Sequence, residues 1–139
     1  NFTSYKNCTI FKPNLAEIKS GMNIDFNADN VAEIEKVSTQ LRTQLSAKAI
    51  LLTLSERGIC INSTDGFKHT PAFKRDIIDV SGAGDTVISV AALCLASAMD
   101  YIDLSILSTL AGGIVCAEVG VVPINKEKLL AEALEHISE

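Results

Sequence analysis

The 139-residue sequence is poor in aromatic residues and in basic charge. Aromatic side chains make up 5% of the chain, and the 17 acidic residues outnumber the 12 lysines and arginines, which gives a formal net charge of -5. Proteins that bind nucleic acid usually present a basic surface, often with aromatic side chains that stack on bases. The composition therefore argues against nucleic acid as a partner.

Paired cysteines and long apolar runs are also missing. The four cysteines, Cys8, Cys60, Cys94 and Cys116, are far apart and form no C-x-x-C pair. This favours buried, reduced thiols in a cytoplasmic protein over disulfides or a zinc site. The longest uncharged run, residues 86–99, is too short to cross a bilayer, so no membrane partner is expected. The sequence contains no internal repeat or low-complexity linker.

What the sequence does contain is an alternation of helical and strand patterns that fits one domain. Hydrophobic residues make up 47% of the chain and are mostly aliphatic. The alternation predicts a three-layer α/β/α architecture with a mostly parallel sheet. We expect strands at 7–12, 47–54, 59–62 and 67–70, with a further strand ending at Ile77-Ile78, and helices beginning at 14 and spanning 29–45, 83–99, 103–119 and 125–137.

The central motif is the stretch Asp79–Thr86, Asp-Val-Ser-Gly-Ala-Gly-Asp-Thr, which precedes an apolar helix. Gly82 and Gly84 allow a sharp turn and a close approach of the backbone to a ligand. The N–H groups of Ala83, Gly84 and Asp85 are expected at the helix start, where free donors and the positive dipole end attract anions. The Asp85 carboxylate could then orient an attacking hydroxyl in phosphoryl transfer. The alternative is an ordinary glycine turn before a buried helix.

Asn14 and Glu17 lie three residues apart, on one face of the first turn of a helix. One interpretation is a capping box, in which each side chain accepts a hydrogen bond from the backbone of the other residue. The other is a pair of oxygen groups that face a ligand. The two interpretations are compatible.

The strand that ends at Thr53 is followed by a loop containing Ser55, Glu56 and Gly58 and then by a hairpin, an arrangement suited to binding a nucleotide. The alternative is that Thr53 only caps the strand and that Glu56 is a solvated loop charge. Further along, Gly112 and Gly113 interrupt a predicted helix at a cost of about 1 kcal/mol each. The close approach of a neighbouring helix or of a flat ligand would explain them.

Residues 79–90 resemble the C-terminal signature of the ribokinase-like (PfkB) family of sugar and nucleoside kinases. The resemblance implies that Gly82, Ala83 and Gly84 form an anion hole for the transferred phosphoryl group and that Asp85 is the catalytic base. Asp79 and Ser81 match the place where many family members bind a monovalent cation such as K⁺. A turn-stabilising contact between these two residues is the structural alternative.

Two further segments match the family. Asn14 and Glu17 resemble its N-x-x-E element, which contacts Mg²⁺ and phosphate through water. The segment at 53–58 resembles its T-x-G-x-x-G nucleotide loop, with Ser55 in place of the first glycine and with Thr53 and Gly58 retained.

The helix that contains Gly112 and Gly113 matches the family region that packs beside the adenine ring. Thr109 stands where many members have an asparagine, which departs from the family pattern.

The resemblance covers the C-terminal half of such a kinase, so residues 1–139 are expected to be the nucleotide-binding and catalytic part of one domain. The Ser55-Glu56 pair resembles one branch of the family. The segments 53–58 and 82–88 together are most similar to that branch, which contains the heptose-7-phosphate kinases of ADP-heptose and lipopolysaccharide core synthesis. The implied reaction transfers the ATP γ-phosphate to the anomeric hydroxyl of the sugar phosphate. A fructokinase, ribokinase or adenosine kinase, and a nucleotide-binding fragment without catalysis, remain as alternatives.

The family places most sugar-binding residues in the N-terminal half, so the 139 residues alone are expected to be inactive. That half would also provide any homodimer contact. An H-x-G-H element is absent from the sequence, so a nucleotidyltransferase activity is not expected within it.

Overall fold

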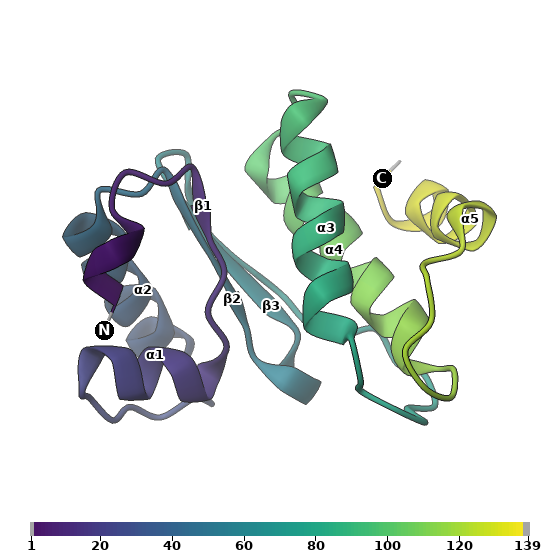
Figure 1. The fold of residues 1–139 in the computed structure, drawn as a ribbon, viewed down its shortest axis with the longest axis horizontal. Helices are drawn as coiled ribbons and strands as arrows, with labels where there is room; N and C mark the ends of the chain where they lie inside the picture. Colours follow the sequence, from purple (N-terminus) through teal and green to yellow (C-terminus); the bar gives the residue numbers. More distant parts are fainter. Residues whose placement is uncertain (1, 138–139) are drawn as a thin grey trace. The chain divides into compact units, whose positions relative to one another are not determined.

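The structure of the chain is a computed structural model that describes residues 2–137. It divides into two compact units, the first ending at His69 and the second beginning at Thr70 (Figure 1). The first unit contains nearly all of the sheet, whereas the regular structure of the second is helical.

The first unit contains a four-stranded sheet in the order β1-β2-β3-β4, in which β1 and β2 are parallel and β2 and β3 are antiparallel. Two helices accompany it, and Figure 1 shows both on the same side of the sheet. Its elements are the 3-10 helix η1 (Phe2–Tyr5), β1 (Ile10–Phe11), α1 (Leu15–Met22), α2 (Val31–Leu45), β2 (Ala49–Thr53), the 3-10 turn η2 (Ser55–Arg57), β3 (Ile59–Ser63) and β4 (Gly66–Thr70).

The expectation of a mostly parallel sheet is wrong for the described residues, because the sheet is small and mixed. Residues 7–12 contribute only a two-residue strand, Ile10–Phe11, to the parallel pair. β2 then returns directly into β3 through η2, and a connection this short can join only antiparallel strands. Parallel neighbours need a longer connection, which usually contains a helix. Between the parallel strands β1 and β2 this connection includes α2.

The core of the first unit forms where α2 packs on β2. The helix presents one apolar stripe, and Ile34, Leu41 and Leu45 are each at most 1% exposed. β2 supplies Ile50 and Leu52 to the same hydrophobic cluster. The 3.6-residue period of the helix and the apolar run of the strand therefore led to a correct prediction of both elements.

The second unit consists of α3 (Ala83–Ala96), α4 (Tyr101–Cys116) and α5 (Lys126–His136). α3 ends earlier than predicted, and Ala98 adopts a left-handed backbone (φ 57°) just after it. α4 begins earlier, because the Asp100 side chain accepts hydrogen bonds from the N–H groups of Ile102 and Asp103. Asn125 caps α5 as predicted.

The predicted strand ending at Ile77-Ile78 is absent. Residues 71–80 have no regular structure, and Ile77 and Ile78 are 58% and 59% exposed. The N–H groups of Ile78 and Asp79 both donate to the carbonyl of Cys116, so the segment is attached to the end of α4 and has no neighbouring strand there. The two adjacent isoleucines led to the prediction of a buried strand. A strand forms there only if a neighbouring strand is available to pair with it.

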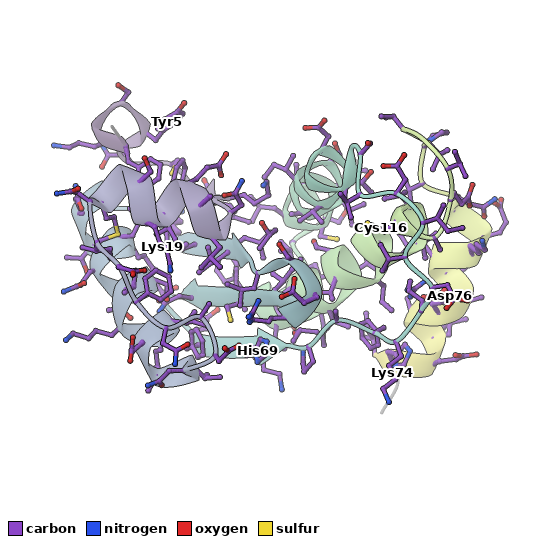
Figure 2. The ribbon with its side chains drawn as sticks, turned by 90° about the horizontal axis from the view of Figure 1, so that it is seen from below. Tyr5, Lys19, His69, Lys74, Asp76 and Cys116 are labelled. Carbon is purple, nitrogen blue, oxygen red and sulfur yellow. The ribbon has the colours of Figure 1, made fainter. Side chains whose placement is uncertain are left out.

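The cysteines are free thiols, as expected: Cys60, Cys94 and Cys116 are buried, and Cys8 is half-buried. Of these, Figure 2 labels Cys116. Burial raises the pKa of Cys60 to about 12, which makes it an inert core residue. Among the residues that the structure describes, no helix combines the length and the apolar character needed to cross a bilayer.

Candidate functional site

Asn14 and Glu17 form the capping box that their spacing predicts. The Asn14 N–H donates to Glu17 Oε2 at 2.7 Å, and the Glu17 N–H donates to Asn14 Oδ1 at 2.8 Å. Both residues are exposed, so the second carboxylate oxygen of Glu17 remains accessible to a ligand. Capping α1 and meeting a ligand are therefore compatible roles for this pair.

Asn14 lies beside Thr53, which brings two predicted elements together within the first unit. The two residues form a parallel bridge, and the Thr53 N–H donates to the carbonyl of Pro13 at 3.1 Å. The N-x-x-E turn and the loop after β2 therefore lie at the carboxyl ends of two parallel strands. Ligands of α/β proteins usually bind at such an edge.

The loop after β2 is the short turn Ser55–Gly58. Ser55 has a left-handed backbone (φ 55°), a conformation that favours glycine, and the family motif has glycine at this position. The Leu54 N–H donates to the Gly58 carbonyl at 2.8 Å, and the Gly58 N–H donates to the Ser55 carbonyl at 3.1 Å. These bonds close the turn and leave Ser55 and Glu56 exposed. The Glu56 carboxylate accepts a hydrogen bond from the Arg57 guanidinium.

In the second unit, Gly82 forms the turn that begins α3. Its φ of 75° is left-handed, and a Cβ at this position would lie 2.9 Å from Cγ1 of Val121. Backbone conformation and packing therefore both require glycine here. Gly84 differs, because it already lies inside α3 and is exposed.

The expected set of three free N–H groups at this turn is reduced to two. The Ala83 N–H donates to the Val80 carbonyl at 3.2 Å, so it is not available to a ligand. Within the described residues, no hydrogen bond engages the N–H of Gly84 or of Asp85. These two donors, at the positive end of a 14-residue helix, could bind an anion beside the exposed Asp85 carboxylate.

Asp79 connects two loops near this helix start. Its Oδ1 accepts the Ser81 N–H at 2.9 Å, and its Oδ2 accepts the Gly120 N–H at 3.0 Å. Hydrogen bonds from the Ser81 side chain and N–H, together with the Gly120 N–H, hold the pKa of Asp79 below its usual range. The turn contact between Asp79 and Ser81 is thus present.

The segment that leads into this loop is anchored by residues that no sequence pattern indicates. The Arg75 guanidinium makes a two-pronged ion pair with Glu132 of α5, at 2.7 and 3.3 Å. The Phe73 ring packs on the His136 ring of the same helix, with centroids 4.4 Å apart. Since these pairs are about 60 residues apart in the chain, no local pattern could have indicated them.

Packing within the second unit explains the two helix glycines. A Cβ on Gly112 would lie 2.9 Å from Val87 of α3, and a Cβ on Gly113 would lie 2.8 Å from Nε of Arg75. Thr109 is buried, and its hydroxyl donates to the Ser105 carbonyl at 2.7 Å. A nucleotide contact at these three positions stays a prediction.

The exposed oxygen groups fit a hard cation that keeps several of its waters. Asn14 and Glu17 offer an amide and a carboxylate on one turn, which suits Mg²⁺ held partly through water and phosphate. In the described part of the chain, no cluster of three or more His, Cys, Asp or Glu residues could enclose a metal ion.

Comparison with known sequences identifies relatives along nearly the whole chain. The sequence model of the pfkB family carbohydrate kinases matches residues 3–128. The bifunctional protein HldE of Methylococcus capsulatus is 37% identical over 130 residues, covering 93% of this chain and 27% of that protein. HldE of Koribacter versatilis is 34% identical over 131 residues, covering 94% of this chain and 26% of that protein. The chain thus spans about a quarter of the length of these relatives.

Solved structures show the same fold at lower identity. Ribokinase from Thermotoga maritima matches with a TM-score of 0.76 and 23% identity, over 92% of this chain and 42% of that one. Phosphofructokinase-2 from Escherichia coli, in complex with potassium, matches with a TM-score of 0.87 and 16% identity, over 99% of this chain and 43% of that one. At these identities the similarity shows a fold shared with part of each of those chains.

Proposed function

Because the chain belongs to the pfkB family of carbohydrate kinases, we propose that it forms the catalytic part of a heptose-phosphate kinase. The reaction would transfer the ATP γ-phosphate to the anomeric hydroxyl of D-glycero-D-manno-heptose 7-phosphate, a step in ADP-heptose and lipopolysaccharide core synthesis. Support for this acceptor comes from the HldE proteins, which are 37% and 34% identical to the chain. The Ser55-Glu56 pair, similar to that branch of the family, supports the same assignment.

The observation that carries the proposal is the start of α3. Two free N–H groups, those of Gly84 and Asp85, are available beside an exposed carboxylate. The N–H groups would hold the negative charge of the transferred phosphoryl group. The Asp85 carboxylate would orient the attacking hydroxyl and accept its proton late, since the loose transition state of phosphoryl transfer requires only a weak base.

The remaining predicted residues would bind the nucleotide and its ions. We assign ATP contacts to Thr53 and to the Ser55–Gly58 turn, and water-mediated contacts to Mg²⁺ and phosphate to Asn14 and Glu17. Mg²⁺, when bound, neutralises charge on the phosphate oxygens. Thr109, Gly112 and Gly113 would pack beside the adenine ring. Asp79 and Ser81 would bind a monovalent cation such as K⁺.

We further propose that residues 1–139 are the C-terminal part of a three-layer α/β/α kinase domain. The share of the relatives and of the solved structures that the chain covers supports this proposal. The sugar-binding residues, and any homodimer contact, would then lie in the remainder of the domain. The 139 residues alone would release no ADP in response to a sugar phosphate, and the intact protein would act in the cytoplasm.

The test is a phosphotransfer assay on the intact protein that contains this chain. ADP release is measured with heptose 7-phosphate, fructose 6-phosphate, ribose and adenosine as acceptors. We expect kcat/KM for heptose 7-phosphate to exceed that of the others by about 100-fold or more, as for a site built to bind polar substrate groups. Preference for another acceptor would overturn the heptose assignment, and ATP binding without transfer to any acceptor would overturn the kinase assignment.

A further inference from the structure

The Ser55–Gly58 turn is held by contacts beyond its own backbone bonds. Arg57 is the residue through which they act. Its Nε donates to Asp29 Oδ1 at 2.6 Å, and its carbonyl oxygen lies 2.7 Å from Nε2 of His69. Asp29 directly precedes the N-cap of α2, and His69, labelled in Figure 2, lies on β4. One residue of the turn is therefore attached to two other elements of the first unit.

Arg57 transmits this attachment to the exposed part of the turn. Its guanidinium also contacts the carboxylate of Glu56. The direction of the Glu56 side chain therefore depends on an arginine whose own direction Asp29 sets. The Arg57 hydrogen bond is the largest cause of the lowered pKa of Asp29, so the Asp29 carboxylate is ionised at neutral pH and the ion pair is complete.

These contacts are poorly suited to a purely stabilising role. The Arg57 and Asp29 side chains are 35% and 72% exposed, and exposed ion pairs contribute little to stability. The turn, however, contains Ser55 in a left-handed conformation that serine adopts unfavourably. Strained backbone persists where surrounding contacts fix it, and it is found preferentially at functional sites.

We infer that Asp29, Arg57 and His69 form a positioning set, the Arg57 clamp, which holds the Ser55–Gly58 turn in the geometry that binds the nucleotide. The inference rests on the proposed function, in which this turn contacts ATP. The clamp residues themselves need not touch the nucleotide. Their effect is to restrict the turn to its binding conformation before ATP arrives, which lowers the entropic cost of binding.

The test uses Asp29→Asn and His69→Phe in the intact protein. Asp29→Asn removes the charge from the ion pair, and His69→Phe removes the ring N–H while keeping a ring of similar size. For each variant we expect the KM for ATP to rise about fivefold to twentyfold, the range for weakening a charged hydrogen bond in Asp29→Asn or losing a neutral one in His69→Phe. The KM for the sugar acceptor and kcat should stay within about twofold, and the melting temperature should change little.

Two further variants separate positioning from general structural damage. His69→Gln retains a side-chain N–H donor and should restore much of the ATP affinity. Lys68→Ala changes the exposed neighbour of His69 on β4 and should leave all kinetic constants unchanged.

The outcomes distinguish this inference from the proposed function. An active parent whose KM for ATP is unchanged in both variants would overturn the clamp and leave the kinase intact. An equal rise in both KM values together with a lower melting temperature would also overturn it, because the contacts would then be structural. If the parent phosphorylates no acceptor, the proposed function fails, and ATP titration calorimetry on the same variants decides the clamp: weaker binding supports it and equal binding rejects it.

Discussion

The Gly82 turn of the second unit and the Ser55 turn of the first both contain a left-handed residue and an exposed carboxylate. In the Gly82 turn the left-handed residue is a glycine without steric strain, and Val121 leaves no room for a Cβ. In the Ser55 turn the same conformation is imposed on a serine, and contacts of Arg57 hold it. The residue type at Gly82 thus suits its backbone conformation, whereas the conformation of Ser55 depends on contacts made by its neighbours.

The two carboxylates differ in a corresponding way. Glu56 is paired with the Arg57 guanidinium, whereas no ion pair within the described residues involves Asp85. The charge of a paired carboxylate is already balanced by its partner. An unpaired carboxylate beside two free N–H groups is available to accept a hydrogen bond from a substrate hydroxyl. In our proposal the Ser55 turn binds the nucleotide and the Gly82 turn carries the chemistry, a division that three sets of variants would test.

The largest expected effect is that of Asp85→Asn. Asparagine is nearly isosteric, but it removes the proton acceptor, so kcat of the intact protein should fall by about 10² to 10⁴. ATP affinity should hold or rise slightly, because repulsion between the carboxylate and the γ-phosphate is relieved. Steady-state kinetics and ATP titration calorimetry on the same preparation would measure both quantities.

Glu56→Gln is the matched control for Asp85→Asn. It makes the same chemical change in the other turn and should alter kcat by no more than about threefold, because Glu56 has no role in proton transfer in our proposal. A normal kcat in Asp85→Asn, or an equal loss in the two variants, would contradict the division between the turns.

An intermediate effect is expected for alanine at Gly82 and at Gly84, and the two substitutions should change stability in opposite directions. Gly82→Ala should lower the free energy of unfolding by about 2–3 kcal/mol, since left-handed alanine costs about 1–2 kcal/mol and crowding against Val121 adds to it. Gly84→Ala should be neutral or stabilising by up to about 1 kcal/mol, because alanine is the better helix former. Urea denaturation of both variants would measure these changes.

Activity should fall in both variants. At Gly84 the added methyl group would obstruct the approach of a phosphate to the helix start, so kcat should drop although the protein is no less stable. A fully active Gly84→Ala variant would show that this glycine has no part in phosphate binding.

The smallest effect is expected for Ser55→Gly. Glycine relieves left-handed strain of about 1–2 kcal/mol but gains about 0.4–1 kcal/mol of conformational freedom in the unfolded chain. The net result should be a stabilisation of about 0.5–1 kcal/mol in chemical denaturation. A destabilised Ser55→Gly variant would mean that the serine side chain makes a compensating contact, and the contrast between the two turns would then disappear.

Local sequence signals predicted the parts of the molecule that local chemistry determines. The capping box of Asn14 and Glu17, the stripe of α2 and the left-handed glycine at 82 all follow from residues within one or two turns of each other. The failures concern partners in space. Ile77 and Ile78 looked like the end of a strand, but the carbonyl of Cys116 binds their segment instead.

The candidate site shows the same limit. Spacing and the family resemblance were enough to select the candidate residues at positions 14, 53–58 and 82–85, whose roles stay predictions. Sequence patterns did not indicate that the Ala83 N–H donates to the Val80 carbonyl. Nor did they indicate the contacts of Arg57 with Asp29 and His69. The Arg57 contacts join residues that are far apart in sequence and depend on how the chain folds between them. The periodicity of a sequence gives no information about that path.

The way in which α5 is held has a consequence for motion. The helix has no buried residue, and it is attached through Glu132 to Arg75, through His136 to Phe73 and through Lys128 to Glu118. A helix without a buried face opens at low free energy, so its amide hydrogens should exchange with solvent long before those of α4. Each opening should release Arg75 and Phe73 together, whereas the hydrogen bonds from Ile78 and Asp79 to the carbonyl of Cys116 remain, so the added motion is expected at residues 71–76.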